Sequence, residues 1–132
     1  MNTKTVLTVS AIFLGLFGIG LSFLPNEIVM YLNIEADPIL PLLLQLMGSL
    51  YLGFGIMNWM AKGSLIGGIY NKPIAIGNFM HFGVGAITLG KNVFGIQVHT
   101  EFIILLTVIY AVFALSFAYI FMTNPGKIGA KK

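Results

Sequence analysis

Four long apolar runs without a single charged residue constrain this chain more than any other feature of its sequence. They cover residues 5–24, 39–61, 73–90 and 102–122. An α-helix rises about 1.5 Å per residue, so runs of this length cross the roughly 30 Å hydrocarbon core of a bilayer, the third only just. We therefore expect an all-α fold: a four-helix transmembrane bundle with up-down-up-down topology, in which residues 1–132 form a single integral membrane domain.

The composition agrees with a surface that faces lipid. Hydrophobic residues make up 58% of the chain and charged residues 8%, whereas soluble domains contain about 25% charged residues. All seven cationic side chains are lysines, which excludes a bidentate arginine clamp for phosphate. We interpret the net charge of +3 as a topology signal and expect no binding of nucleic acid. The absence of cysteine excludes thiolate metal sites and disulfide exchange.

Lysines in the flanks and loops predict the orientation. The N-terminal flank, the loop at 62–72 and the C-terminal tail together contain six lysines, whereas the loop at 91–101 contains one and the first loop none. The positive-inside rule then places both termini in the cytoplasm. A signal peptide is the alternative for the first run, but that run is long and no A-x-A-like cleavage site follows it before Pro25. The first loop is itself apolar, and we expect a short interfacial segment there.

Small residues recur at helical spacing in two of the runs. The first run has Ala11, Gly15, Gly18 and Ser22, and the fourth has Thr107, Ala111, Ala114 and Ala118. Small side chains allow membrane helices to approach closely, so both stripes predict helix packing. The alternative is a smooth wall along a substrate path.

The third run has a polar face, and the second run offers a matching one. The third-run face contains Asn78, His81, Gly85 and Thr88, and Asn71 and Asn92 extend it beyond both ends. The second-run face contains Tyr51, Gly55, Asn58 and Lys62. Unsatisfied polar groups are costly in lipid, so we expect these faces to point into the bundle or toward a partner chain. From their depths along the helices, Tyr51, His81 and Tyr110 should share a layer near the midplane.

Four of these residues are our candidate binding residues: Tyr51, Asn58, Asn78 and His81. His81 is the only residue inside a run that titrates near neutral pH, and an intramembrane ionisable residue suggests a functional site. A neutral imidazole that bridges two helices is the structural alternative. We expect no catalytic residue, no cofactor and no metal site, since His99 and Glu101 are too few ligands for a metal.

The stretch from Gln45 to Lys91, QLMGSLYLGFGIMNWMAKGSLIGGIYNKPIAIGNFMHFGVGAITLGK, resembles small four-helix bacterial membrane proteins of the DoxX-like kind in layout. The resemblance covers the second and third runs and includes no catalytic motif. It implies a small four-helix protein of the bacterial inner membrane and carries no functional residue onto this chain.

Three functions follow from the sequence, in order of preference. The first is a non-catalytic membrane role, as an accessory subunit of a larger complex or as a self-assembling bundle, because packing faces outnumber chemical groups. The second is binding or passage of a small apolar or amphipathic molecule, such as a quinone or a lipid, beside the polar faces. The third is an intramembrane enzyme, which has one candidate base and no nucleophile pair. The expected partners are membrane lipids, further copies of the chain or a larger complex.

Overall fold

The computed structural model describes residues 2–35, 37–63, 72–95 and 99–123, and these residues form five α-helices with no strand among them. The helices are α1 (Thr3–Phe23), α2 (Pro25–Tyr31), α3 (Ile39–Ala61), α4 (Lys72–Asn92) and α5 (Thr100–Met122). By length and composition, α1, α3, α4 and α5 are able to cross a membrane. The all-α class and the four predicted runs are confirmed, with ends that differ by no more than two residues.

Polar side chains and prolines set the helix ends. The Asn2 side chain accepts a hydrogen bond from the backbone N–H of Lys4 at 3.1 Å and caps α1. Pro25 occupies the first turn of α2, where its missing N–H costs least. The Asp37 carboxylate accepts a bond from the Ile39 N–H at 2.8 Å at the start of α3. The first loop therefore contains a short helix as predicted; its position at a membrane interface stays a prediction.

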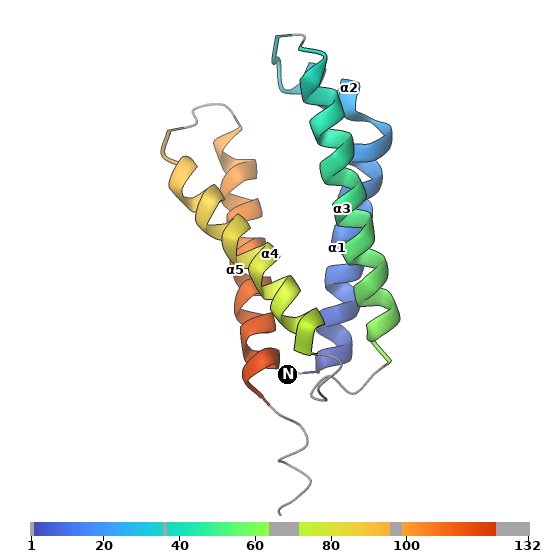
Figure 1. Cartoon of the computed structure of the whole chain (residues 1–132). Coiled ribbons are helices and arrows are strands. Elements are labelled where there is room, and N and C mark those ends of the chain that lie inside the picture. Colours follow the sequence, from blue (N-terminus) through green and yellow to red (C-terminus); the bar gives the residue numbers. More distant parts are fainter. Residues whose placement is uncertain (1, 36, 64–71, 96–98, 124–132) are drawn as a thin grey trace, which may run out of the picture. The chain divides into compact units, whose positions relative to one another are not determined.

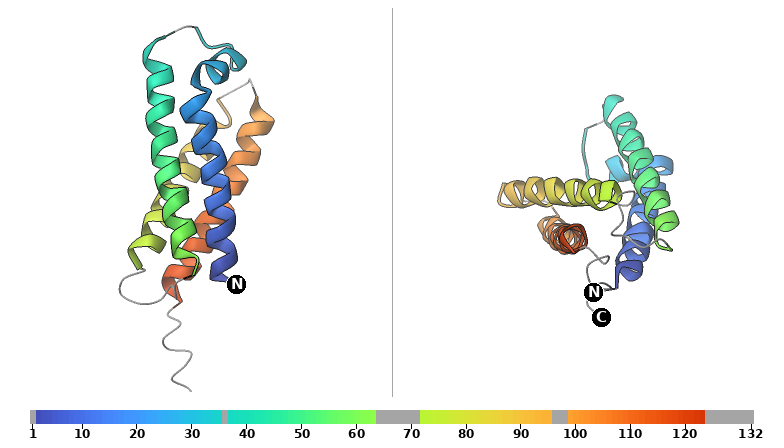
Figure 2. Two further views of the ribbon diagram at one scale, coloured as in Figure 1. Left: turned by 90° about the vertical axis from the view of Figure 1, so that its right-hand side faces the viewer. Right: turned by 60° about the horizontal axis from the view of Figure 1, so that its bottom comes forward.

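The helices form two hairpins, which we describe separately. The first contains α1, α2 and α3, up to Lys62, and the second contains α4 and α5. In the first hairpin, α1 and α3 lie side by side along their length, and α2 connects them at one end (Figure 1, Figure 2). In the second, α4 packs against α5. The single domain that we predicted for the whole chain stays a prediction.

Glycines allow the backbones of α1 and α3 to come into contact. A Cβ atom built on Gly18 would lie 2.8 Å from the backbone nitrogen of Leu52 and 3.0 Å from the Gly48 carbonyl oxygen. A Cβ built on Gly48 would lie 2.9 Å from the Gly18 carbonyl oxygen. Such a separation leaves no space for a side chain and permits weak Cα–H···O contacts between the helices.

The same interface continues toward the other end of the hairpin. A Cβ on Gly55 would lie 3.2 Å from both the Ala11 carbonyl oxygen and the Gly15 nitrogen, and one on Gly48 would also meet Ser22. The predicted stripe Ala11, Gly15, Gly18 and Ser22 is thus confirmed as a packing face. Gly15 contributes only its backbone, since a Cβ on Gly15 would have no neighbour within 4 Å. The pairing of Gly18 with Gly48 and of Ala11 with Gly55 shows that the two helices are antiparallel.

The packing of α4 against α5 uses aromatic rings. A Cβ on Gly85 would lie 2.5 Å from two ring carbons of Tyr110, so Gly85 makes room for this ring. Phe82 stacks on Phe113 with ring centroids 4.7 Å apart, and its ring lies nearly parallel to that of Phe117 at 5.9 Å. The buried residues of α5 are Tyr110, Phe113, Ala114, Phe117 and Ile120.

The predicted small-residue stripe of α5 is only partly tested by this packing. Of Thr107, Ala111, Ala114 and Ala118, Ala114 is buried and the other three are half-buried, so a packing role for the whole stripe stays a prediction. The ring of Tyr110 fits against Gly85 of α4, and the rings of Phe113 and Phe117 fit against Phe82. Thr107 does contribute: its methyl group would lie 3.9 Å from a Cβ on Gly90.

Large apolar side chains cover the outer faces of all four long helices. Leu16 of α1 is 66% exposed, Met60 of α3 is 76% exposed and Leu115 of α5 is 72% exposed. In water this much exposed apolar surface would drive aggregation, whereas in hydrocarbon it carries no penalty. The surface is therefore compatible with a multi-pass membrane protein.

Candidate functional site

The four candidate binding residues lie in two different hairpins. Tyr51 and Asn58 belong to α3 in the first hairpin, and Asn78 and His81 belong to α4 in the second. Within each hairpin the structure defines what these side chains contact. A single site that joins all four stays a prediction.

Asn58 is fully buried and connects α3 to α1. Its Nδ2 donates a hydrogen bond to the hydroxyl oxygen of Ser10 at 3.1 Å, and the Ser10 hydroxyl donates to the Leu7 carbonyl oxygen at 3.1 Å. The Ser10 oxygen is thus both donor and acceptor in a buried polar chain between two apolar helices. Gly55, one turn away, also packs on α1. Part of the α3 face that we expected to point into the bundle or toward a partner chain therefore serves the α1–α3 interface.

A double-mutant cycle on Ser10 and Asn58 tests this hydrogen bond. We expect Ser10→Ala and Asn58→Leu each to destabilise the protein, with a coupling energy of about 0.6–1.7 kcal/mol, the range found for interhelical hydrogen bonds in membranes. The measurement is unfolding by titration of a denaturing detergent into mixed micelles. Thr8, whose hydroxyl donates to the Lys4 carbonyl of its own helix at 2.8 Å, provides the control: Thr8→Ala with Asn58→Leu should show additive effects.

The polar residues of α4 divide into a buried part and an exposed part. Asn78 is fully buried, and its Nδ2 donates to the Ile74 carbonyl oxygen at 2.9 Å. Thr88 and Asn92 are exposed, so this part of the stripe does not point into the chain's own interior, and its alternative position toward a partner chain stays a prediction. Their side chains donate to the carbonyl oxygens of Val84 and Thr88, at 2.9 and 2.8 Å. A hydroxyl or amide that bonds its own helix needs no interior partner, so these residues tolerate exposure.

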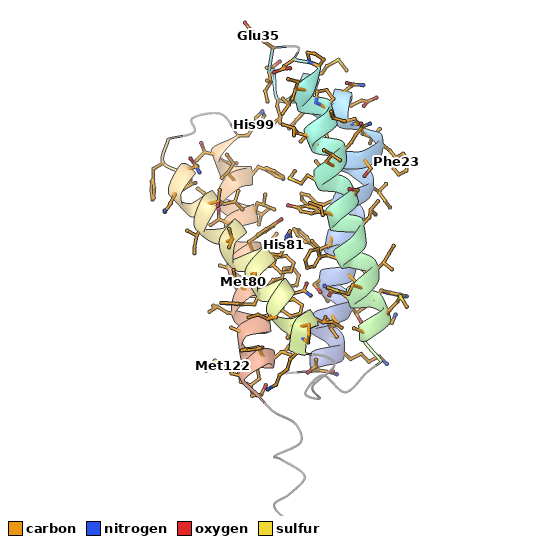
Figure 3. The ribbon with its side chains drawn as sticks, in the orientation of Figure 1. Phe23, Glu35, Met80, His81, His99 and Met122 are labelled. Carbon is orange, nitrogen blue, oxygen red and sulfur yellow. The ribbon has the colours of Figure 1, made fainter. Side chains whose placement is uncertain are left out.

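His81 lies half-buried in a cluster of aromatic rings. Figure 3 labels His81 on α4. The His81 ring contacts Phe82 edge-on at a centroid distance of 4.9 Å and Tyr110 at 5.7 Å, and Phe82 contacts Tyr110 edge-on at 5.2 Å. The predicted sharing of a layer by His81 and Tyr110 is thereby confirmed. The imidazole and the phenol hydroxyl are the polar groups of this cluster, and aromatic rings with few polar groups are typical of sites for amphipathic molecules.

Two central residues were not singled out from the sequence. Phe82 is fully buried at the middle of the α4–α5 interface, and Ser10 is the partner of Asn58. A signal for Phe82 was present, since Tyr110, Phe113 and Phe117 follow one face of α5 at spacings of three and four. Nothing in the local sequence distinguished Ser10 from Ser22, which lies on a neighbouring part of the same helix.

The start of α5 is formed by His99 in a left-handed conformation (φ 55°). Glu101 is exposed in the first turn of α5, where the helix dipole favours a negative charge. In the part of the chain that the structure describes, no three of the His, Asp and Glu side chains gather into a group able to hold a metal ion. The segment 64–71, which includes Asn71 at one end of the predicted polar face, lies outside the described residues.

No known protein family, no curated protein and no solved structure matches this chain. The resemblance to DoxX-like proteins thus stays an expectation. The class that the structure itself supports is a helical protein with four helices long and apolar enough to span a membrane.

Proposed function

We propose that the chain is a multi-pass protein of the bacterial inner membrane with a non-catalytic role, as an accessory subunit or a self-assembling bundle. One observation carries this proposal: polar side chains of the long helices are used for helix integrity and packing. Asn78, Thr88, Asn92 and Thr107 donate to carbonyl oxygens of their own helices, and Asn58 donates to Ser10. A catalytic site needs polar groups that point toward a substrate, whereas these groups donate hydrogen bonds to other atoms of the protein.

The proposal includes the arrangement across the membrane. The two antiparallel hairpins would give an up-down-up-down bundle with both termini and the 62–72 loop in the cytoplasm, since six of the seven lysines lie on that side. Membrane lipids would cover the outer apolar faces. Further copies of the chain or other subunits would cover those parts that lipid does not.

Native mass spectrometry of the protein in a mild detergent tests the role directly. We expect a defined assembly, either several copies of this chain or this chain with other subunits. A single copy that releases no partner and turns over a substrate would contradict the proposal.

Cysteine labelling tests the topology. Because the chain has no cysteine, a maleimide labels only the single cysteine that each variant introduces. We expect Glu35→Cys to react with a membrane-impermeant maleimide on intact cells, and Lys62→Cys to react only after the cells are opened. Reaction of Lys62→Cys on intact cells would contradict the orientation, and equal protection of both positions would contradict the even number of spans.

A second candidate function rests on the ring cluster of His81, Phe82 and Tyr110. We infer that this cluster would bind a small amphipathic molecule such as a quinone, with the imidazole or the phenol as hydrogen-bond partner. The observation that favours it is the position of a half-buried imidazole 5.7 Å from a buried phenol ring in an apolar helix pair.

Substitution of His81 separates the two functions. If the imidazole is a packing element, His81→Leu should lower the free energy of unfolding by about 1–2 kcal/mol, and His81→Gln should lose less, since an amide still donates and accepts. If it binds a ligand, stability should change little in both variants and co-purified quinone or lipid should be lost. The measurements are thermal unfolding and extraction of bound small molecules. Unchanged stability with unchanged bound material in His81→Leu would contradict both functions.

A further inference from the structure

Two lysines from different helices lie at the same end of the first hairpin. The hydrogen bond between Ser10 and Asn58 fixes the register of the antiparallel pair. Lys4 lies six residues before Ser10 and Lys62 four residues after Asn58, which corresponds to about 9 Å and 6 Å toward the same end. This register brings the two ammonium groups to one end of the hairpin, where desolvation and then the charge of Lys4 lower the pKa of Lys62.

Trp59 holds one of the two ammonium groups in place. The Nζ atom of Lys62 lies over the indole ring, 2.7 Å from its centroid, and Trp59 itself is 51% exposed. A cation over an indole face is attracted by the ring quadrupole. Tryptophan also prefers the headgroup level of a bilayer, so the ring would place Lys62 at the depth of the lipid phosphates.

No carboxylate neutralises this pair of lysines within the described part of the first hairpin. All three acids of that hairpin, Glu27, Glu35 and Asp37, follow the C-terminal end of α1 and precede α3. The 21 residues of α1 separate them from Lys4 by about 30 Å, three times the screening length of physiological salt or more. The sequence from Gly63 to Asn71 also contains no acid. No acid in the described part of this hairpin therefore neutralises the two positive charges, which leaves them available to an external anion.

We propose that Lys4, Lys62 and Trp59 form a binding site for the phosphate of an anionic phospholipid headgroup, such as phosphatidylglycerol. Two point charges from neighbouring helices suit a single phosphate, which needs no bidentate geometry. The acyl chains would follow the exposed apolar surface of α3, where Met60 is 76% exposed. A bound headgroup would link the N-terminus of α1 to the C-terminus of α3. This inference rests on the proposed membrane location.

The experiment compares short-chain lipids as probes on the full chain in detergent. Thermal stability is followed while dioctanoyl phosphatidylglycerol, dioctanoyl phosphatidylcholine or inorganic phosphate is added. We expect phosphatidylglycerol to stabilise the wild type at concentrations where the other two have little effect. Lys62→Gln should weaken its apparent affinity about fivefold, and Lys4→Gln with Lys62→Gln about 25-fold, since each lysine near a membrane surface contributes about 1 kcal/mol.

Two variants serve as matched controls. Lys91→Gln removes the same charge from an exposed position in the other hairpin and should leave the affinity unchanged. Lys62→Arg keeps the charge and should retain most of the binding, which separates loss of charge from loss of folding. Equal stabilisation by phosphatidylcholine, equal stabilisation by inorganic phosphate, or an equal effect of Lys91→Gln would each overturn the site.

The membrane proposal is tested separately in the same preparation. The wild-type chain should stay in the membrane pellet after an alkaline carbonate wash. Release by carbonate would contradict the membrane location itself, whereas retention without any preference for phosphatidylglycerol would overturn only the headgroup site.

Discussion

Gly48→Ala should lower the free energy of unfolding by about 2 kcal/mol and separate α1 from α3. The added methyl group would meet the Ser22 nitrogen at 2.8 Å and the Gly18 carbonyl oxygen at 2.9 Å, and both are backbone atoms that no rotamer change moves away. Overpacking of this kind costs about 1–3 kcal/mol. The loss of close backbone contacts adds to it, because dispersion and Cα–H···O contacts replace the hydrophobic effect between helices in lipid. Alanine is the better helix former by about 1 kcal/mol, which offsets part of the loss.

Gly53→Ala is the matched control on the same helix. A Cβ on Gly53 would have no neighbour within 4 Å, so this variant keeps the gain in helix propensity and should be neutral or slightly stabilising. Both variants are compared by unfolding in mixed micelles. A similar change in stability for Gly48→Ala and Gly53→Ala would mean that the α1–α3 backbone contact does not hold the hairpin together.

The helices themselves were predictable because hydrophobicity and charge decide where a chain enters lipid. No charge interrupts residues 5–24 or 102–122, and a 20-residue apolar run has few other stable states in or out of a bilayer. The α1 stripe was predictable for a similar reason. Gly18 and Ser22 repeat at the helical period, and a row of small side chains at that period allows a partner helix to approach closely.

The partner of each face was not predictable, since two faces of similar polarity look alike in one sequence. Asn58 could have faced α4 as well as α1; only the register set by Gly18 and Gly48 brings it to Ser10. The exposure of Thr88 could not be predicted for a different reason. Its hydroxyl donates a hydrogen bond to the Val84 carbonyl of the same helix. The spacing of polar residues does not show whether a polar side chain bonds its own helix or a neighbouring one.

The sequence predicted neighbouring residues of the candidate site correctly only within one hairpin. The depth argument for His81 and Tyr110 uses two helices joined by a short loop, so errors in depth stay small and their proximity is confirmed. The extension to Tyr51 and Asn58 requires the packing of one hairpin against the other. Such packing depends on many contacts spread over whole helix faces, and the positions of a few polar residues do not predict those contacts.

Phe82→Ala should be the most damaging substitution in the second hairpin, with a loss of about 3 kcal/mol. Phe82 is fully buried and touches Phe113, Phe117 and Tyr110 at centroid distances of 4.7, 5.9 and 5.2 Å. Truncation of a buried phenylalanine costs about 3–5 kcal/mol in soluble proteins, partly from transfer out of water and partly from the cavity left behind. In lipid the transfer part is small because the unfolded chain also remains in hydrocarbon, so we expect the lower end of that range.

Phe94→Ala isolates the contribution of packing from the loss of an aromatic residue. Phe94 is 95% exposed just after α4, so its truncation removes the same atoms without opening a cavity and should change stability by less than about 0.5 kcal/mol. Phe82→Leu should lie between the two, because it fills most of the volume but loses aromatic contacts worth about 0.5–1.5 kcal/mol each. The order Phe82→Ala, Phe82→Leu, Phe94→Ala in unfolding free energy would establish the ring cluster as the core of this hairpin. Equal effects of Phe82→Ala and Phe94→Ala would show that α4 and α5 are held together by something other than their aromatic interface.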